Sequence, residues 1–329
     1  MPSNEPKTII LGAGASRGVS YAQGMKTLSP LDTDFFDLLQ RLETKDKQDA
    51  KAITFVVQQA LEAPGDQLWT SMERLFYTRH LNAVMRHKLI LANDSPDPAK
   101  ELLRNFARAI QALLRAAHGK EVCFHHDRVF QRLAGQDAIL TFNYDLVAER
   151  ALRKHLGIPE FGPWLYGFEV SPDRTVDVPL LHKLHGSVNW RSTTKGRFPE
   201  VRQKSWADFD EKPGYADFAP PFSILLPYWE KRVEEPPWLS IWRAAAGHLM
   251  ETTSLIIWGY SLPLTDLKAR ELLRATLSSG ANLKHVAVID PSERVREKWR
   301  GEFVKQKFWQ YKDIEDFLVN PPAWYRPAR

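Results

Sequence analysis

The chain contains a single cysteine, Cys123, among its 329 residues. One thiol cannot form an intramolecular disulfide, and a cysteine-based zinc cluster needs several thiolates. The N-terminal residues lack the basic region, apolar core and cleavage site of a signal peptide. No apolar run approaches the ~20 residues that are needed to cross a bilayer. We therefore expect a cytoplasmic protein with no membrane-spanning segment.

The sequence also has no block of charge of one sign. Its 45 lysines and arginines are interspersed with 40 aspartates and glutamates, which gives a net charge of +5. This mild, scattered basicity is unlike a nucleic-acid-binding arm, so we expect no direct sequence-specific binding to nucleic acid. The hydrophobic share of 43% is that of an ordinary globular protein.

Short apolar segments alternate with amphipathic helical segments in two parts of the chain. The predicted strands lie within residues 7–16 and over 138–142, 180–184, 255–258 and 285–289. Helices are predicted over 145–156 and 239–250, from about residue 264, and after residue 291. This alternation predicts an α/β fold with a Rossmann-like parallel sheet and helices on both faces.

Two long stretches interrupt this pattern. Residues from about 20 to 137 carry apolar residues at three- and four-residue spacing, which predicts a largely helical insertion. Residues from about 190 to 237 are irregular and rich in proline and tryptophan. We predict a single domain over 1–329 that contains both insertions. The tryptophans of the second stretch and its border either form a partner surface or pack the core: Trp206, Trp229, Trp238 and Trp242.

Polar side chains follow several of the predicted strands directly. Asn143 and Asp145 follow the second strand, His185 follows the third, and Asp290 follows the last. Ligands of parallel sheets bind beyond the carboxyl ends of the strands, where these side chains would meet. The sequence therefore predicts a nucleotide site that holds an amide, a carboxylate and an imidazole.

A glycine turn, Gly-Ala-Gly-Ala-Ser at residues 12–16, follows the first strand. Glycines there let the backbone approach a pyrophosphate, whose charge N–H groups at a helix start can hold. The alternative is an ordinary strand-to-helix turn, because the turn lacks a third glycine at the spacing of the usual dinucleotide fingerprint.

Each of the other candidates also has a purely structural alternative. Asn143, Asp145 and Asp290 are residue types that cap helices, although an amide at a buried strand end normally requires a partner. His185 is either a structural histidine or a base, and Gly186 beside it permits close approach of a ligand. The pair His125-His126 with Cys123 lacks a further ligand at a suitable spacing, so we expect no metal site.

Taken together, these segments resemble the sirtuin superfamily. The matching segments, in chain order, are 12–16, 141–145, 184–186, 259–262 and Asp290. The resemblance implies an NAD⁺ site in which the nicotinamide–ribose bond is broken. It leaves the two insertions without a counterpart.

The resemblance also implies roles for individual residues. Asn143 would order the ribose and an attacking water, Asp145 would bind the nicotinamide carboxamide, and His185 would be the base at the ribose hydroxyls. The phosphates would be held by Gly12, Ala13, Gly14 and Ser16, and the phosphate and adenosine half would face Gly259, Ser261 and Asp290. NAD⁺ carries its own leaving group, so the reaction requires no metal.

The lack of cysteines after His185 indicates which kind of sirtuin-like protein the chain resembles. Deacylase sirtuins usually carry a four-cysteine zinc module after the catalytic histidine, whereas this chain has no cysteine after His185. In this respect it resembles zinc-less bacterial sirtuin-like effectors of antiphage defence. Those proteins hydrolyse NAD⁺ and often work with a HerA-type ATPase or an Argonaute-like partner.

The resemblance thus implies an NAD⁺ glycohydrolase that releases nicotinamide and ADP-ribose and depletes NAD⁺ in antiphage defence. Its activity would be controlled by a homo-oligomer or by a separate partner protein. Two alternatives stay open: an NAD⁺-dependent protein deacylase, and a non-catalytic NAD⁺ or ADP-ribose sensor that gates a partner.

Overall fold

The computed structural model describes most of the chain: residues 5–17, 28–62, 71–89, 98–118, 123–157, 162–169, 179–191, 200–201, 224–226, 233–234, 237–264, 266–277 and 282–325. Within these ranges the central element is a six-stranded sheet of order β3-β2-β1-β6-β7-β8, in which every pair is parallel. Its strands are β1 (Lys7–Leu11), β2 (Ala138–Thr141), β3 (Leu180–Lys183), β6 (Ser254–Trp258), β7 (His285–Ile289) and β8 (Lys307–Tyr311). The Rossmann-like prediction is confirmed.

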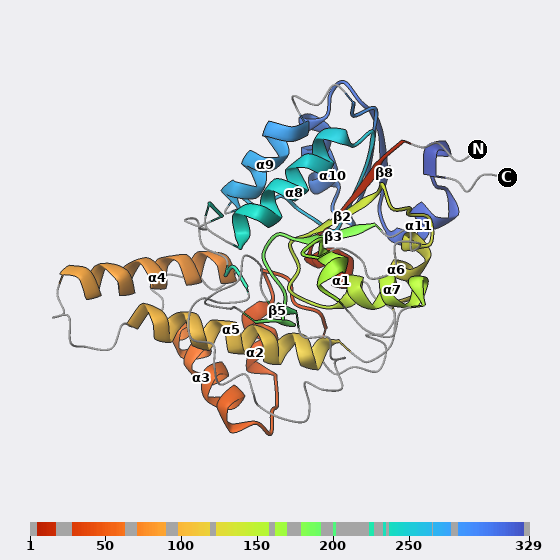
Figure 1. The fold of residues 1–329 in the computed structure, drawn as a ribbon. Helices are drawn as coiled ribbons and strands as arrows, with labels where there is room; N and C mark the ends of the chain where they lie inside the picture. Colours follow the sequence, from red (N-terminus) through yellow and green to blue (C-terminus); the bar gives the residue numbers. More distant parts are fainter. Residues whose placement is uncertain are drawn as a thin grey trace.

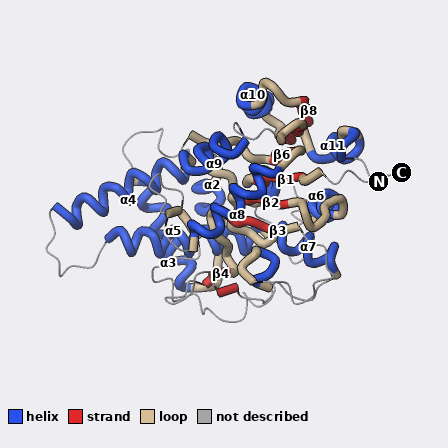
Figure 2. Tube along the Cα trace, turned by 45° about the horizontal axis from the view of Figure 1, so that its top comes forward, coloured by secondary structure: helices blue, strands red, loops and turns tan. Residues whose placement is uncertain are grey.

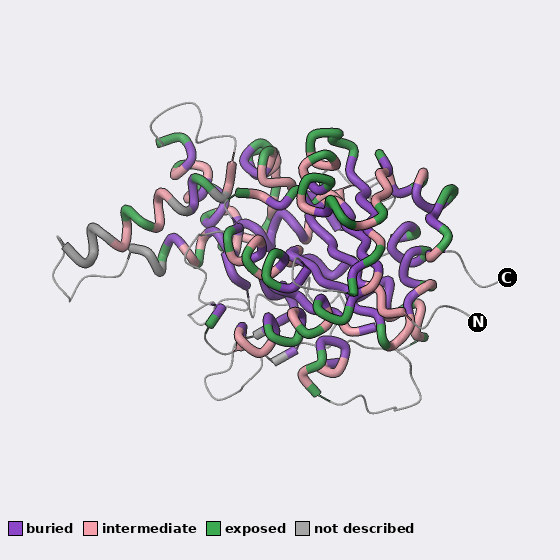
Figure 3. Tube along the Cα trace, turned by 90° about the horizontal axis from the view of Figure 1, so that it is seen from above, coloured by how far each residue is buried: buried purple, intermediate pink, exposed green. Residues whose placement is uncertain are grey.

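The inner strands of the sheet form the core of the molecule. All residues of β2 and β6 are buried, as are all but the first of β1 and β7, and Figure 3 shows this buried centre. Strands covered on both faces read as continuous apolar runs, which is why they were visible in the sequence. The strand order reverses between β1 and β6, where such sheets form a ligand-binding crevice.

Helices cover both faces of the sheet. Figures 1 and 2 show α6 (Phe124–Phe130) and α7 (Val147–Leu156) on one side, with α8 (Trp238–Glu251) and α9 (Leu267–Leu277) on the other. Helix α7 ends at Gly157, whose φ of 64° is left-handed, as its place after the last periodic residue indicated. The remaining helices of the sheet region are α10 (Glu293–Glu302), α11 (Ile314–Val319) and the 3₁₀ turns η3 (Pro163–Tyr166) and η6 (Ala323–Tyr325).

The first insertion is helical, as predicted. After the short α1 (Ala13–Arg17) it contains α2 (Phe35–Gln40), α3 (Lys47–Leu61), α4 (Met72–Leu89) and α5 (Pro98–Ala117), which gather beside the sheet in Figure 1. Helix α5 packs against α3 and α4 through buried residues such as Phe106 and Leu113. Buried Asp49 on α3 accepts hydrogen bonds from Arg108 and Arg115 on α5, at 2.7 and 3.2 Å.

The second insertion lies largely outside the described residues. Its described part includes a two-stranded antiparallel pair of β4 (Trp190–Arg191) and β5 (Glu200–Val201), where the sequence predicted no regular structure. Trp206 and Trp229 fall outside the described ranges. Trp238 and Trp242 begin α8 and are buried, so these two pack the core rather than form a partner surface.

Two elements at the end of the chain were missed by the sequence reading. Strand β8 is a half-exposed edge strand that mixes polar and aromatic residues, without the apolar run of a central strand. The short helix α11 follows it, capped by the Asp313 carboxylate, which accepts from Asp316 N. No helix in the described ranges is long and apolar enough to span a membrane.

Candidate functional site

A cavity of about 810 Å³ lies at the carboxyl edge of the sheet. Its walls include residues that follow all six strands of the sheet, and its volume is within the ~300–1,000 Å³ typical of small-ligand pockets. Most of the predicted site residues line it: Gly12, Ala13, Gly14, Asn143, Asp145, His185, Gly259, Ser261 and Asp290. The exception is Ser16, which is buried and contacts two of the lining residues.

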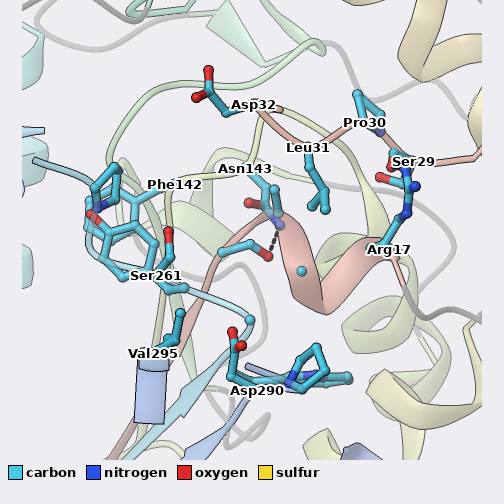
Figure 4. Close-up of a pocket in the computed structure, with 18 of the residues that line it drawn as sticks. Arg17, Ser29, Pro30, Leu31, Asp32, Phe142, Asn143, Ser261, Asp290 and Val295 are labelled. Carbon is cyan, nitrogen blue, oxygen red and sulfur yellow. Dashed lines mark hydrogen bonds between the residues drawn. The ribbon is translucent and has the colours of Figure 1, made fainter. Parts of the chain in front are cut away.

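Asn143, Ser16 and Asp145 form one hydrogen-bonded cluster where β1 and β2 end. The Asn143 amide donates from Nδ2 to Gly12 O at 2.9 Å, a bond drawn in Figure 4, and to Ser16 Oγ at 3.2 Å. Ser16 Oγ in turn donates to Asp145 Oδ2 at 2.8 Å. Because its N–H groups are engaged in this way, Asn143 can present its carbonyl oxygen, Oδ1, to a hydroxyl or a water.

Asp145 has both a structural and an electrostatic role. Its Oδ1 accepts a hydrogen bond from Val147 N at 3.0 Å at the first residue of α7, although the N-cap position itself is occupied by Leu146. Burial by itself would raise the pKa of the Asp145 carboxyl. His118, Lys183 and the hydrogen bonds from Val147 and Ser16 outweigh that effect and hold the pKa below its usual value. The carboxylate is thus ionised at neutral pH and can accept hydrogen bonds from an amide.

His185 lies two residues beyond β3, buried among aromatic rings. Phe142 meets it edge-on, with ring centroids 5.1 Å apart, and Tyr144 lies 6.3 Å away. The next residue, Gly186, has a φ of 84°, a left-handed conformation that favours glycine. His185 Nε2 is 3.1 Å from Asp266 Oδ2.

Asp266 is a residue of this site that the sequence analysis did not predict. It precedes α9, where an aspartate is typical of a helix cap, and its Oδ1 does accept from Ala269 N at 3.4 Å. It is buried and lines the cavity. The available signal was its position just after the sirtuin-like segment 259–262, but only the fold brings it to His185.

The glycine turn is shaped by packing between β1 and β6. Gly12 N donates to Trp258 O, and Gly14 N donates to Gly259 O, both at 3.0 Å. A Cβ on Gly12 would lie 2.4 Å from Gly259 O, and one on Gly259 would lie 2.2 Å from Ala15 N. The glycines therefore serve the close approach of two strand ends, and phosphate binding by this turn stays a prediction.

Asp290 and Ser261 lie at some distance from Asn143 along the cavity wall in Figure 4. Asp290 Oδ1 accepts from Ser292 N at 2.9 Å, and burial raises the pKa of this carboxyl. Lys298 Nζ donates to Ser261 O at 3.0 Å, which fixes the loop after β6. Chemically different groups thus line separate parts of one cavity, as an elongated ligand such as a dinucleotide requires.

The helical insertion contributes a further wall that the sequence did not predict. Ser29, Pro30, Leu31 and Asp32 line the cavity beside Asn143 in Figure 4. Arg17 at the end of α1 fixes this segment, because it donates to Ser29 O at 2.7 Å and pairs with Asp34 at 2.6 Å.

Cys123, His125 and His126, the residues considered as metal ligands, have other partners in the structure. His126 Nδ1 lies 3.1 Å from Cys123 Sγ, and burial lowers the pKa of His126 to about 3. His125 lies beside Glu315 instead, at 3.4 Å. Among the residues that the structure describes, no three histidine, cysteine or acidic side chains are grouped to hold a metal ion.

Comparison with known proteins identifies the family. Residues 137–317 match the model of the SIR2-like domain. That match spans more than half of the chain, which therefore belongs to the SIR2-like family, a family of generally NAD⁺-dependent enzymes. No curated protein matches the sequence significantly.

Solved structures similar to this chain include several sirtuins. One is a sirtuin structure that addresses the structural basis of sirtuin substrate affinity. It is 15% identical in sequence, the match covers 95% of this chain and 91% of the sirtuin chain, and the TM-score is 0.43. A Sir2 homologue bound to NAD has 12% identity, coverages of 95% and 86%, and a TM-score of 0.43. An ADP-ribose complex of a Sir2 homologue has 14% identity, coverages of 97% and 92%, and a TM-score of 0.40.

Proposed function

We propose that this protein is an NAD⁺ glycohydrolase that cleaves the nicotinamide–ribose bond to release nicotinamide and ADP-ribose. The observation that supports it best is the convergence of Asn143, Asp145 and His185 on one cavity, with Asp290 on the same cavity. These are the residue types and positions that the sirtuin resemblance assigned to NAD⁺ cleavage. NAD⁺ enters this account as the substrate, and the reaction is written without a metal.

In this proposal, the reaction separates charge at the ribose. The C1′–N bond breaks, its electron pair leaves with nicotinamide, and the ribose acquires oxocarbenium character, as in glycoside cleavage. The Asp145 carboxylate holds the nicotinamide carboxamide, and Asn143 Oδ1 orients the ribose hydroxyl and the attacking water. His185 accepts a proton from a ribose hydroxyl as the bond breaks. Water then adds to C1′ and loses one proton to solvent, while His185 returns its proton to the ribose oxygen.

The biological setting belongs to the same proposal. We place the enzyme among regulated effectors of antiphage defence, because an unregulated enzyme of this kind would deplete the NAD⁺ of its host. Control would come from a homo-oligomer or from a separate partner, such as a HerA-type ATPase or an Argonaute-like protein. A protein deacylase and a silent sensor are the competing functions.

The test is chromatography of NAD⁺ after incubation with the purified chain, alone and with an acetylated peptide. Asn143→Ala and His185→Ala each remove one proposed reacting group. Matched controls are Asn105→Ala, which removes an exposed amide on α5, and His155→Ala, which removes an imidazole on α7. Neither control residue lines the cavity.

Nicotinamide and ADP-ribose from the wild type and both controls, but from neither site variant, is the expected result. Acetyl-ADP-ribose formed only with the peptide would replace the proposal by deacylation. Tight NAD⁺ binding without turnover, at high protein concentration and with a co-purified partner, would replace it by the sensor.

A further inference from the structure

His185 and Asp266 form a buried pair within the cavity. The distance from Nε2 to Oδ2 is 3.1 Å, and the two side chains are 7% and 2% exposed. The carboxylate is held from two further directions, because Tyr260 OH donates to the same Oδ2 at 3.3 Å and Ala269 N donates to Oδ1 at 3.4 Å. A carboxylate fixed in this way cannot turn away from the imidazole without giving up both bonds.

We propose that Asp266 is a positioning residue that fixes the tautomer of His185 and stabilises its protonated form. An ionised carboxylate only accepts hydrogen bonds, so the Nε2 atom that faces it must carry a proton. The basic nitrogen of His185 is then Nδ1. When a ribose O–H bond breaks, its proton forms an N–H bond at Nδ1, and the imidazolium charge is balanced by Asp266.

The surroundings of the ring support an electrostatic role. The rings of Phe142 and Tyr144, after β2, lie beside His185, and Asp266, before α9, faces its Nε2; Tyr260, after β6, contacts Phe142 and Asp266. Of these, Asp266 supplies the negative charge, and in a buried site an opposite charge at this distance favours the protonated imidazole. Capping α9 requires only Oδ1, an oxygen that an asparagine also supplies, and does not account for Oδ2 facing the histidine.

The effect of Asp266 on turnover rests on the proposed function, whereas its effect on the tautomer of His185 can be measured without any catalytic activity. The imidazole nitrogen resonances of His185, assigned by their loss in His185→Gln, report the tautomer in the wild-type protein. The protonated nitrogen is expected to be Nε2. A wild-type His185 with its proton on Nδ1 would overturn the inference, whatever the variants do.

The second test compares Asp266→Asn with Asp46→Asn. Asp46 also caps a helix, since its Oδ1 accepts from Gln48 N and Asp49 N at the start of α3, and it lies outside the cavity lining. Both asparagines keep a cap and remove a charge. The measured pKa of His185 is expected to fall by about one unit or more in Asp266→Asn and to stay unchanged in Asp46→Asn. Equal pKa values in all three proteins would reject the electrostatic role.

Turnover supplies the third readout. In a wild type that cleaves NAD⁺, Asp266→Asn is expected to lower kcat about 10²- to 10⁴-fold, with KM little changed. Asp266→Glu should recover part of that loss, because it restores the carboxylate. A wild type that never cleaves NAD⁺ would reject the proposed function and leave the resonance measurements to decide on Asp266. A cleaving enzyme that is indifferent to Asp266→Asn would reject the inference alone.

Discussion

Some side chains at this site have a structural role in the fold as well as a role in the proposed chemistry. Ser16 illustrates this, because its hydroxyl donates to Asp145 and accepts from Asn143. It is buried and does not line the cavity, so any influence on NAD⁺ must pass through its two neighbours. Asn143 and Asp145 are thus positioned by a residue that does not itself line the cavity.

We expect Ser16→Ala to reduce NAD⁺ cleavage by about tenfold to a hundredfold, because Asn143 and Asp145 lose their common anchor. Steady-state kinetics provide the measurement, with the loss mainly in kcat. Ser71→Ala is the control, since the Ser71 hydroxyl only accepts from Arg74 N at the start of α4. A Ser16→Ala enzyme as active as that control would show that Asn143 and Asp145 are positioned without this hydroxyl.

Asp266 shows which kind of site residue the sequence alone does not predict. Asn143, His185 and Asp290 were found because each directly follows an apolar strand. Asp266 does not directly follow a strand, and its contact with His185 arises only when the start of α9 packs near the end of β3. Neither propensity nor spacing encodes such a contact, whereas strand ends follow from the strands themselves.

Pairs of elements are joined at the site by close backbone contact and by a buried ion pair. The ends of β1 and β6 meet through Gly12, Gly14 and Gly259. The ends of β2 and β3 are joined by Lys183, whose ammonium group donates to Asp145 O and to Glu149 Oε1. These contacts set the relative positions of the strand ends that carry Asn143 and His185.

Gly259→Ala is expected to destabilise the fold by about 2 kcal/mol or more. The φ of 62° is costly for alanine, and the new Cβ would lie 2.2 Å from Ala15 N. Gly247→Ala, inside α8 with open space around the new Cβ, should instead stabilise by about 0.5–1 kcal/mol. Urea unfolding of both variants gives the comparison, and equal midpoints would contradict the packing account of the turn.

Lys183→Met is expected to cost about 3–5 kcal/mol, because it leaves the buried Glu149 carboxylate without its cation. Burial already raises the pKa of Glu149, and removal of Lys183 would raise it further. A folded-state pKa above the unfolded value gives stability that is lost as pH rises, so the deficit should be larger at pH 8 than at pH 5. Urea titrations at both pH values measure it.

The double variant Lys183→Met with Glu149→Leu serves as the control for this prediction. It removes both charges, so much of the lost stability should return, and the pH dependence of the deficit should disappear. If Lys183→Met alone were as stable as the wild type at pH 8, the electrostatic interpretation of the Lys183–Glu149 pair would be wrong.

At the scale of the whole molecule, the central sheet could be predicted from the sequence, whereas its last edge strand and one wall of the cavity could not. The inner strands were predictable because burial on both faces requires an apolar run, and helices such as α7 because burial of one face requires a helical period. Strand β8 was not, because an edge strand that is half exposed needs no such run. The insertion wall beside Asn143 was also missed, since the short segment 28–34 carries no period and is held at the cavity by tertiary contacts such as those with Arg17.

Two buried histidines, His126 and His182, are expected to make the fold sensitive to acid. Burial lowers the pKa values of His126 and His182 to about 3. The unfolded chain binds more protons than the fold below a pH of about 6.5, so stability falls as pH drops from there toward 3. Each histidine contributes a loss of about 2 kcal/mol between pH 6.5 and 5.

Urea midpoints at pH 7 and pH 5 test this expectation on wild type and on His182→Gln. His182 pairs with His248 at 3.1 Å and does not line the cavity. The variant should show a smaller fall in stability between the two pH values than the wild type. Parallel falls in the two proteins would mean that His182 is not one of the groups responsible.

We propose that this chain breaks the nicotinamide–ribose bond with water as the acceptor. The direct measurement is mass spectrometry of the products formed from NAD⁺ in ¹⁸O-labelled water, with protein equimolar to substrate. Free nicotinamide and ADP-ribose that carries the heavy oxygen are expected from the wild type, and neither product from Asn143→Ala. Unlabelled cyclic ADP-ribose, or products that appear only when an acetylated peptide is added, would contradict it.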